Sequence, residues 1–136
     1  MPSESTPAAR PLGSAAARWT PPALWVALIL VGTSWPGINV GPEDLGLDKV
    51  FHFTAYAILS GLVLRATRTP FFWGTFLMVV LAISLFGAVD EWHQAFIPRR
   101  SMSFFDWVAD TAGALAGALA ARFIPFLAPR RTLPAS

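Results

Sequence analysis

The sequence contains no cysteine and few charged residues, and both absences narrow the classes of protein it can represent. Without cysteine there can be no disulfide, no thiolate-bound metal and no cysteine nucleophile. Charged residues make up 13% of the chain, against roughly 25% in ordinary soluble domains, whereas 54% of its residues are hydrophobic. This composition favours a lipid bilayer as the solvent of much of the chain.

Motifs that mark several common catalytic sites are also missing. The chain has no G-x-S-x-G nucleophile elbow and no G-x-x-x-x-G-K-[ST] phosphate loop. Its Asp-Glu-Trp-His-Gln stretch at 90–94 is not the H-E-x-x-H of zinc proteases, because only one histidine lies on that turn. The ten Lys and Arg residues are offset by eight Asp and Glu and are scattered, which argues against nucleic acid as a partner.

Apolar stretches separated by short polar breaks predict an all-α fold, with four transmembrane helices in an up-and-down bundle with short loops. Lipid offers the backbone no hydrogen-bond partner, so helices are the spanning form open to segments of this length. We expect the helices over residues 19–35, 48–64, 71–92 and 104–126. The breaks between them contain the Gly, Pro and charged residues that are typical of turns.

The predicted membrane domain covers residues 21–127, between a disordered arm at 1–20 and a basic tail at 128–136. The arm is rich in Ala, Ser and Pro and holds too few large apolar side chains to pack. Arg18 before a short apolar run also describes a cleaved secretory signal. A tryptophan at each end of the run suits interfacial anchoring, and no small-x-small cleavage site follows, so we expect a retained helix.

The distribution of basic residues predicts a multi-pass protein of the cytoplasmic membrane with both termini in the cytoplasm, because positively charged loops stay on that side. In this orientation the inner segments hold Arg10, Arg18, Arg65, Arg68, Arg122, Arg130 and Arg131. The outer segments hold Lys49, Arg99 and Arg100. Every acidic residue except Glu4 then falls at the outer ends of the helices: Glu43, Asp44, Asp48, Asp90, Glu91, Asp106 and Asp110.

Polar residues recur every fourth position near the outer ends of three predicted helices, within 48–60, 90–94 and 106–110. Residues at this spacing share one helix face. An ionisable group costs about 2.5 to 3.5 kcal/mol at the centre of a bilayer and less near its surfaces, so these groups should face one another or water. We expect a partly hydrated, ligand-binding pocket at the outer face, built from Asp48, Lys49, His52, Tyr56, Asp90, Glu91, Gln94, Arg100, Asp106 and Asp110.

Several of these residues also have a structural interpretation. His52 could be a hydrogen-bonded structural histidine, and Tyr56 could be ordinary core. Asp48 and Asp106 could each cap a helix, since a carboxylate accepts from the free N–H groups at a helix N-terminus.

Capping does not explain the other acidic residues. Asp110 lies one turn deeper than a cap, and Asp90 and Glu91 lie at a helix C-terminus, where the helix dipole disfavours negative charge. Glu91 could instead form an ion pair with Arg99 or Arg100 that closes the loop. The group of acids is therefore more informative than any one member.

Two kinds of chemistry remain open from the residues themselves. His52 and Glu91 are candidate general bases. Asp106 and Asp110 offer the oxygen ligands that a divalent cation such as Mg²⁺ or Mn²⁺ prefers.

Small residues on the fourth predicted helix favour close helix packing. Gly113 and Gly117 form a G-x-x-x-G step with alanines beside it, which lets a neighbouring backbone approach. The same step is a candidate contact for a helix of a partner protein.

Taken in order, the motifs resemble the VanZ-like family of small bacterial integral membrane proteins over residues 48–117. Asp110 departs from the family pattern, in which asparagine is more usual at that position, and the extra acid makes the expected site more negative. The matching residues are Asp48, Lys49, His52, Phe53 and Tyr56; Asp90, Glu91, Gln94, Phe96, Pro98 and Arg100; and Asp106, Asp110, Gly113 and Gly117.

This resemblance implies a protein of the bacterial cell envelope. The founding member is linked to resistance to the glycopeptide teicoplanin. The resemblance and the predicted pocket together lead us to expect that the protein recognises an anionic or lipid-linked envelope component. Its expected partners are membrane lipids or a lipid-linked precursor. The alternatives are a metal-dependent membrane enzyme acting on a lipid head group, and a structural subunit of a membrane complex.

Overall fold

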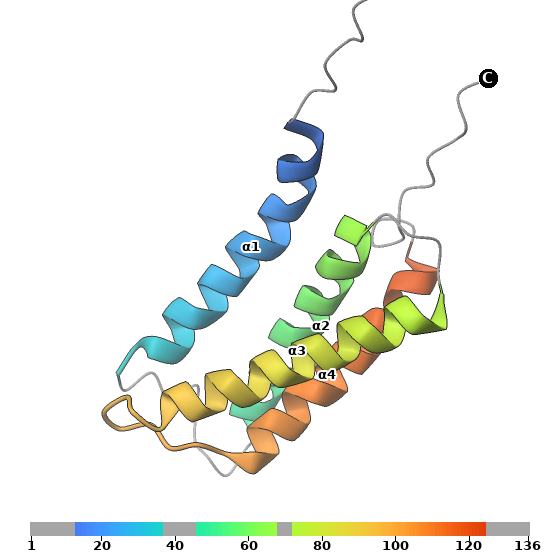
Figure 1. Ribbon diagram of the computed structural model, residues 1–136. Coiled ribbons are helices and arrows are strands. Elements are labelled where there is room, and N and C mark those ends of the chain that lie inside the picture. The colour runs from blue at the N-terminus through green and yellow to red at the C-terminus, as the bar shows by residue number, and fades with distance from the viewer. Residues whose placement is uncertain (1–12, 37–45, 68–71, 125–136) are drawn as a thin grey trace, which may run out of the picture.

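The structure, a computed structural model, describes residues 13–36, 46–67 and 72–124. These residues form four α-helices and no strand, which confirms the predicted all-α bundle (Figure 1). In chain order the helices are α1 Gly13–Ser34, α2 Leu47–Thr67, α3 Trp73–Gln94 and α4 Phe104–Phe123. Each predicted helix is present, with ends that differ from the expected ones.

The largest of these differences lies at the start of α1. Residues 13–20 were expected in a disordered arm but are helical, so this part of the expected arm is wrong. The stretch contains three consecutive alanines, and alanine is the strongest helix former. The Thr20 hydroxyl adds a local hydrogen bond to the Ala16 carbonyl, at 2.9 Å. The remainder of the arm and the tail at 128–136 lie outside the described residues.

Two of the helices, α2 and α3, are long and apolar enough to cross a membrane. On α3 one face remains uncovered by the rest of the described chain, and its large apolar side chains are more than half exposed. These side chains are Leu77, Met78, Leu81 and Leu85. A continuous apolar face of this kind suits contact with lipid.

Close contact between α2 and α4 forms the centre of the bundle. A Cβ atom added at Gly113 would overlap the backbone carbonyl of Phe53, and one added at Gly117 would overlap that of Ala57. The backbone that approaches the G-x-x-x-G step is therefore α2 of the same chain. This corrects the expectation that these two glycines contact a partner helix, because α2 already covers them.

The third helix is joined to α4 by polar contacts within the apolar packing. The Trp107 indole N–H donates to the Ser84 carbonyl at 3.0 Å, and the Ser84 and Thr111 hydroxyls lie 2.8 Å apart. The buried core around these contacts includes Tyr56, Leu59, Phe76, Val79, Ile83, Ala114 and Ala118.

The first helix lies along the side of this three-helix unit and is attached at two levels. Midway along α1, the Trp25 indole N–H donates to the Ala55 carbonyl of α2 at 2.8 Å. Near its end, the Thr33 hydroxyl donates to Asp90 of α3 at 2.8 Å. Successive helices alternate in direction, so the C-terminal ends of α1 and α3 meet the N-terminal ends of α2 and α4 at one end of the bundle (Figure 1).

Candidate functional site

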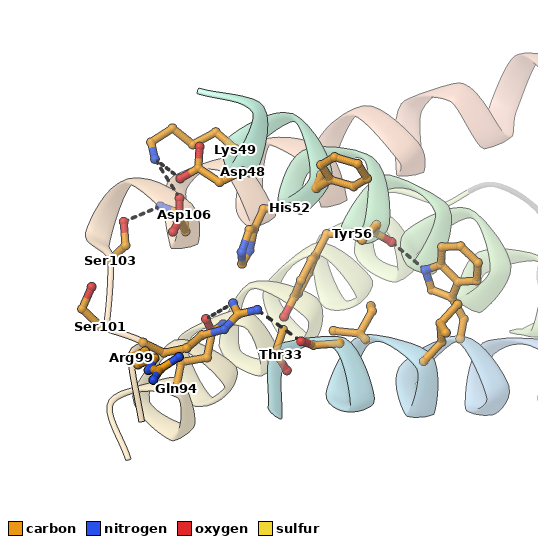
Figure 2. A pocket seen from close by; sticks show the side chains of 17 residues that line it. Thr33, Asp48, Lys49, His52, Tyr56, Gln94, Arg99, Ser101, Ser103 and Asp106 are labelled. Carbon is orange, nitrogen blue, oxygen red and sulfur yellow. Dashed lines mark hydrogen bonds and ion pairs between the residues drawn. The ribbon is translucent and has the colours of Figure 1, made fainter. Parts of the chain in front are cut away.

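A cavity of about 680 Å³ opens at the end where the four helices converge. Its walls come from the second half of α1, the first turns of α2, the loop between α3 and α4, and the start of α4 (Figure 2). Seven of the ten predicted pocket residues line it, namely Asp48, Lys49, His52, Tyr56, Gln94, Arg100 and Asp106. The other three, Asp90, Glu91 and Asp110, are buried beside it.

One edge of the cavity is an ion-pair network centred on Lys49. Its ammonium nitrogen lies 2.7 Å from Asp48 Oδ2 and 3.1 Å from Asp106 Oδ1. Asp106 does not cap α4 with its side chain. The cap is Ser103, whose hydroxyl accepts from the Asp106 backbone N–H at 3.3 Å. The Asp106 carboxylate is thereby left to face Lys49.

The opposite edge is formed by the loop between α3 and α4, which carries Arg100. Its guanidinium donates to Gln94 Oε1 at 3.0 Å and to the Gly32 carbonyl of α1 at 3.2 Å. Arg99 precedes Arg100 and has a positive φ of 68°, a conformation that is uncommon outside glycine. The backbone turns at this residue.

The ion pair expected between Glu91 and Arg99 or Arg100 does not form among the described residues. Instead Glu91 Oε2 accepts from the backbone N–H of Ser103 at 2.8 Å. This contact closes the loop between α3 and α4 by a different route.

Asp90 connects three helices from a buried position. Its Oδ1 accepts from the Thr33 hydroxyl of α1 at 2.8 Å. Its Oδ2 accepts from the Tyr56 hydroxyl of α2 at 3.3 Å and from Gln94 Nε2 at 3.4 Å. Tyr56 belongs both to the core and to this polar cluster, because its ring packs against Phe86 while its hydroxyl donates to Asp90.

His52 meets two further buried carboxylates. Its Nδ1 lies 2.9 Å from Asp110 Oδ1 and 3.8 Å from Glu91 Oε1, and each residue comes from a different helix. Ligand atoms of these three side chains lie within 4.8 Å of one another, which is close enough to hold a metal ion. Asp106, expected to share a cation with Asp110, does not belong to this group because Lys49 engages its carboxylate.

Some residues at the site had not been predicted. Ser103 carried a signal in the sequence, since a serine followed three residues later by an acid is typical of a helix N-terminus. Thr33 and Trp25 carried none, because one hydroxyl and one tryptophan within an apolar run do not indicate which helix they will contact. Ser101 and Gly32 also line the cavity, and only the packing of α1 against the loop brings them there.

Comparison with known proteins gives one informative result. A family model described as VanZ/LLP1 matches residues 7–125 of the chain. No curated protein and no solved structure was found to match the chain. The match includes all four helices and every residue of the cavity described above.

Proposed function

Because the chain belongs to the VanZ/LLP1 family, we propose that it is an integral membrane protein of the cell envelope whose cavity binds the anionic head group of a lipid or lipid-linked component. The observation that supports this most directly is the division of the cavity into a polar end and an apolar wall. A ligand that fills both parts must itself combine a charged group with a hydrocarbon chain.

The apolar wall lies between α1 and α2. It is formed by Trp25, Leu28, Ile29, Phe51 and Ala55. Leu28 and Phe51 are more than half exposed, so this side of the cavity is accessible to an apolar chain from outside the bundle. Burial of apolar surface contributes roughly 25 cal/mol per Å², which makes such a chain a substantial part of the affinity.

The two arginines on the loop edge of the polar end favour an anion there, although the acids lining or buried beside the cavity outnumber its basic residues. Three basic side chains line the cavity against two acidic ones, and His52 lies between them. Lys49 is already paired with both acids, Asp48 and Asp106. Arg100 donates to a side-chain amide and to a backbone carbonyl, and a guanidinium has five N–H donors, so it can also donate to a phosphate or carboxylate that enters the cavity.

We place the cavity on the outer face of the cytoplasmic membrane, with all four helices crossing and both termini in the cytoplasm. The apolar lengths of α2 and α3 support at least two crossings. The sequence assigns seven basic residues to the segments expected in the cytoplasm and three to the outer segments, and this excess supports the orientation. A head group of the outer leaflet would then lie level with the polar end of the cavity.

The family resemblance also implies a link to teicoplanin resistance, and this link can be tested in cells. If the protein acts on an envelope component that teicoplanin needs, expression should raise the inhibitory concentration of teicoplanin. A substitution of Arg100 should remove that effect while the protein remains in the membrane.

Lipid binding tests the proposal directly. Purified protein in mild detergent would be mixed with phosphatidylglycerol, a polyisoprenyl phosphate or zwitterionic phosphatidylcholine, and bound lipid would be counted by native mass spectrometry. We expect retention of the two anionic lipids over phosphatidylcholine. Arg100→Gln should weaken their retention about tenfold, because one charge-assisted hydrogen bond contributes on the order of 1.5 kcal/mol.

Arg65→Gln is the matched control, because Arg65 lies in the last turn of α2 at the opposite end of the bundle. It should leave lipid retention unchanged. Equal retention of anionic and zwitterionic lipids by the unaltered protein would contradict the proposal. So would equal losses in the two arginine variants.

A further inference from the structure

His52, Glu91 and Asp110 form a cluster that head-group binding does not use. Asp110 is fully buried and Glu91 is 2% exposed, whereas His52 borders the cavity. We propose that these three side chains bind one divalent cation with mixed nitrogen and oxygen preference, of the Zn²⁺ or Mn²⁺ type, at the inner wall of the cavity. The site shares Asp110 with the predicted Mg²⁺ pair but has His52 and Glu91 in place of Asp106.

The spacing of the ligand atoms suits one ion. Nitrogen and oxygen ligands bind Zn²⁺ at about 2.0 to 2.2 Å, so ligands of one ion lie about 3 to 3.5 Å apart. The two distances from His52 Nδ1, 2.9 Å to Asp110 and 3.8 Å to Glu91, fall on either side of this range. The ligand atoms of all three side chains lie within 4.8 Å of one another, so they surround a common centre.

The charge of the cluster also calls for a cation. Asp90, Glu91 and Asp110 are buried together, and His52 is the basic side chain that contacts two of them. Asp110 Oδ2 is buried and has no hydrogen-bond partner among the described residues. The other oxygen, Oδ1, is hydrogen-bonded by His52 at 2.9 Å. A buried carboxylate oxygen without a partner is costly; a cation bound to Asp110 would offset the buried charge, and one held by both oxygens would also offset the missing contact.

Groups around the cluster orient the proposed ligands through hydrogen bonds, as residues next to metal ligands commonly do. Glu91 Oε2 is held by the Ser103 backbone N–H, which leaves Oε1 directed toward His52. Gln94 bridges Glu91 and Asp90, at 3.2 and 3.4 Å. Such partners fix carboxylate orientation and raise metal affinity.

An imidazole among the ligands decides the class of metal. Carboxylates alone suit Mg²⁺ or Ca²⁺, whereas an imidazole favours Zn²⁺ and other transition metals. Three protein ligands leave at least one coordination position for water or a bound anion. Since His52 borders the cavity, an ion can enter from there.

Metal titration of the full-length protein tests this proposal. Protein purified in mild detergent would be stripped with chelator and titrated with Zn²⁺, Mn²⁺ and Mg²⁺ by calorimetry, and with Co²⁺ by visible absorption. We expect about one Zn²⁺ or Mn²⁺ per chain and much weaker Mg²⁺ binding. Glu91→Gln and His52→Gln should each weaken Zn²⁺ binding by at least about 100-fold, and His52→Gln should alter the Co²⁺ spectrum.

Asp48→Asn is the matched control, since it removes a carboxylate at the same end of the bundle that lies outside the cluster. It should bind Zn²⁺ as the unaltered protein does, with helix content checked by circular dichroism. Less than one Zn²⁺ or Mn²⁺ per chain in the unaltered protein overturns the proposal even if a variant fails to fold. An equal loss of Zn²⁺ affinity in Asp48→Asn also overturns it. These assays contain no lipid, so their outcome is independent of head-group binding.

Discussion

At the scale of single residues, the site depends on buried polar groups that are matched with one another. Asp90 is the clearest example, because its carboxylate accepts hydrogen bonds from α1, from α2 and from its own helix. Leaving such a group without partners would cost several kcal/mol, so each donor contributes to holding the helices in register.

The contact between Thr33 and Asp90 leads to a prediction about stability. Thr33→Val keeps the shape of the side chain but removes the donor, so we expect a lower thermal midpoint in detergent and a loss of about 1.5 to 3 kcal/mol in the free energy of unfolding. Thr20→Val is the same change on the same helix, at an exposed hydroxyl that bonds only within α1. It should change stability by less than about 0.5 kcal/mol. Equal effects of the two substitutions would contradict this role for Asp90.

At the scale of helices, the fold depends on the absence of side chains at two positions of α4. Gly113 and Gly117 face the carbonyl oxygens of Phe53 and Ala57, so α2 and α4 touch along their backbones. This close approach positions His52 of α2 beside Asp110 of α4, at 2.9 Å. The glycine step is thus a packing feature on which the geometry of the site depends.

Gly117→Ala tests that dependence. The added methyl group would overlap the Ala57 carbonyl, so α2 and α4 must separate. We expect the free energy of unfolding to fall by about 1 to 3 kcal/mol, measured by thermal unfolding followed by circular dichroism. Gly32→Ala provides the control, because a Cβ at Gly32 meets no atom within 4 Å. It should leave stability unchanged or raise it by up to about 1 kcal/mol. A stable Gly117→Ala protein would show that the helices tolerate a wider separation.

At the scale of the whole molecule, the acidic residues of the described chain are segregated to one end. The acids of three helices and the basic residues of the loop after α3 surround the cavity there, while the exposed faces of α3 remain apolar. A protein arranged in this way can keep its charges at a membrane surface and its apolar faces in lipid.

Cysteine labelling tests which membrane surface holds the cavity. The chain has no cysteine, so a single introduced thiol gives a signal without background. Ser101→Cys, at the exposed rim of the cavity, should react with a membrane-impermeant maleimide in intact cells. Phe72→Cys, before the first turn of α3 at the other end, should react only after lysis. The reverse pattern would place the cavity in the cytosol and contradict the proposed orientation.

Much of the fold could be predicted from the sequence because local composition determines it. Long apolar stretches bounded by Gly, Pro and charge marked all four helices, and four-residue spacing showed which polar groups share a face. The start of α1 was the exception, since a weakly apolar stretch with several alanines fits both a helix and an arm. The pairing of Glu91 with Ser103 rather than with an arginine was also beyond prediction, because it depends on the path of one loop.

By itself, the sequence determined that the chain is helical, that nearly all of its acidic residues collect at one end of the helices, and that its motifs resemble a single family. These properties follow from composition and periodicity, which act over a few neighbouring residues. Tertiary structure alone decided which groups meet: Asp110 with His52 rather than with Asp106, Asp90 with Thr33, and the glycine step with α2 of the same chain. Such contacts depend on how closely and at what angle helices pack, and no local pattern specifies either quantity.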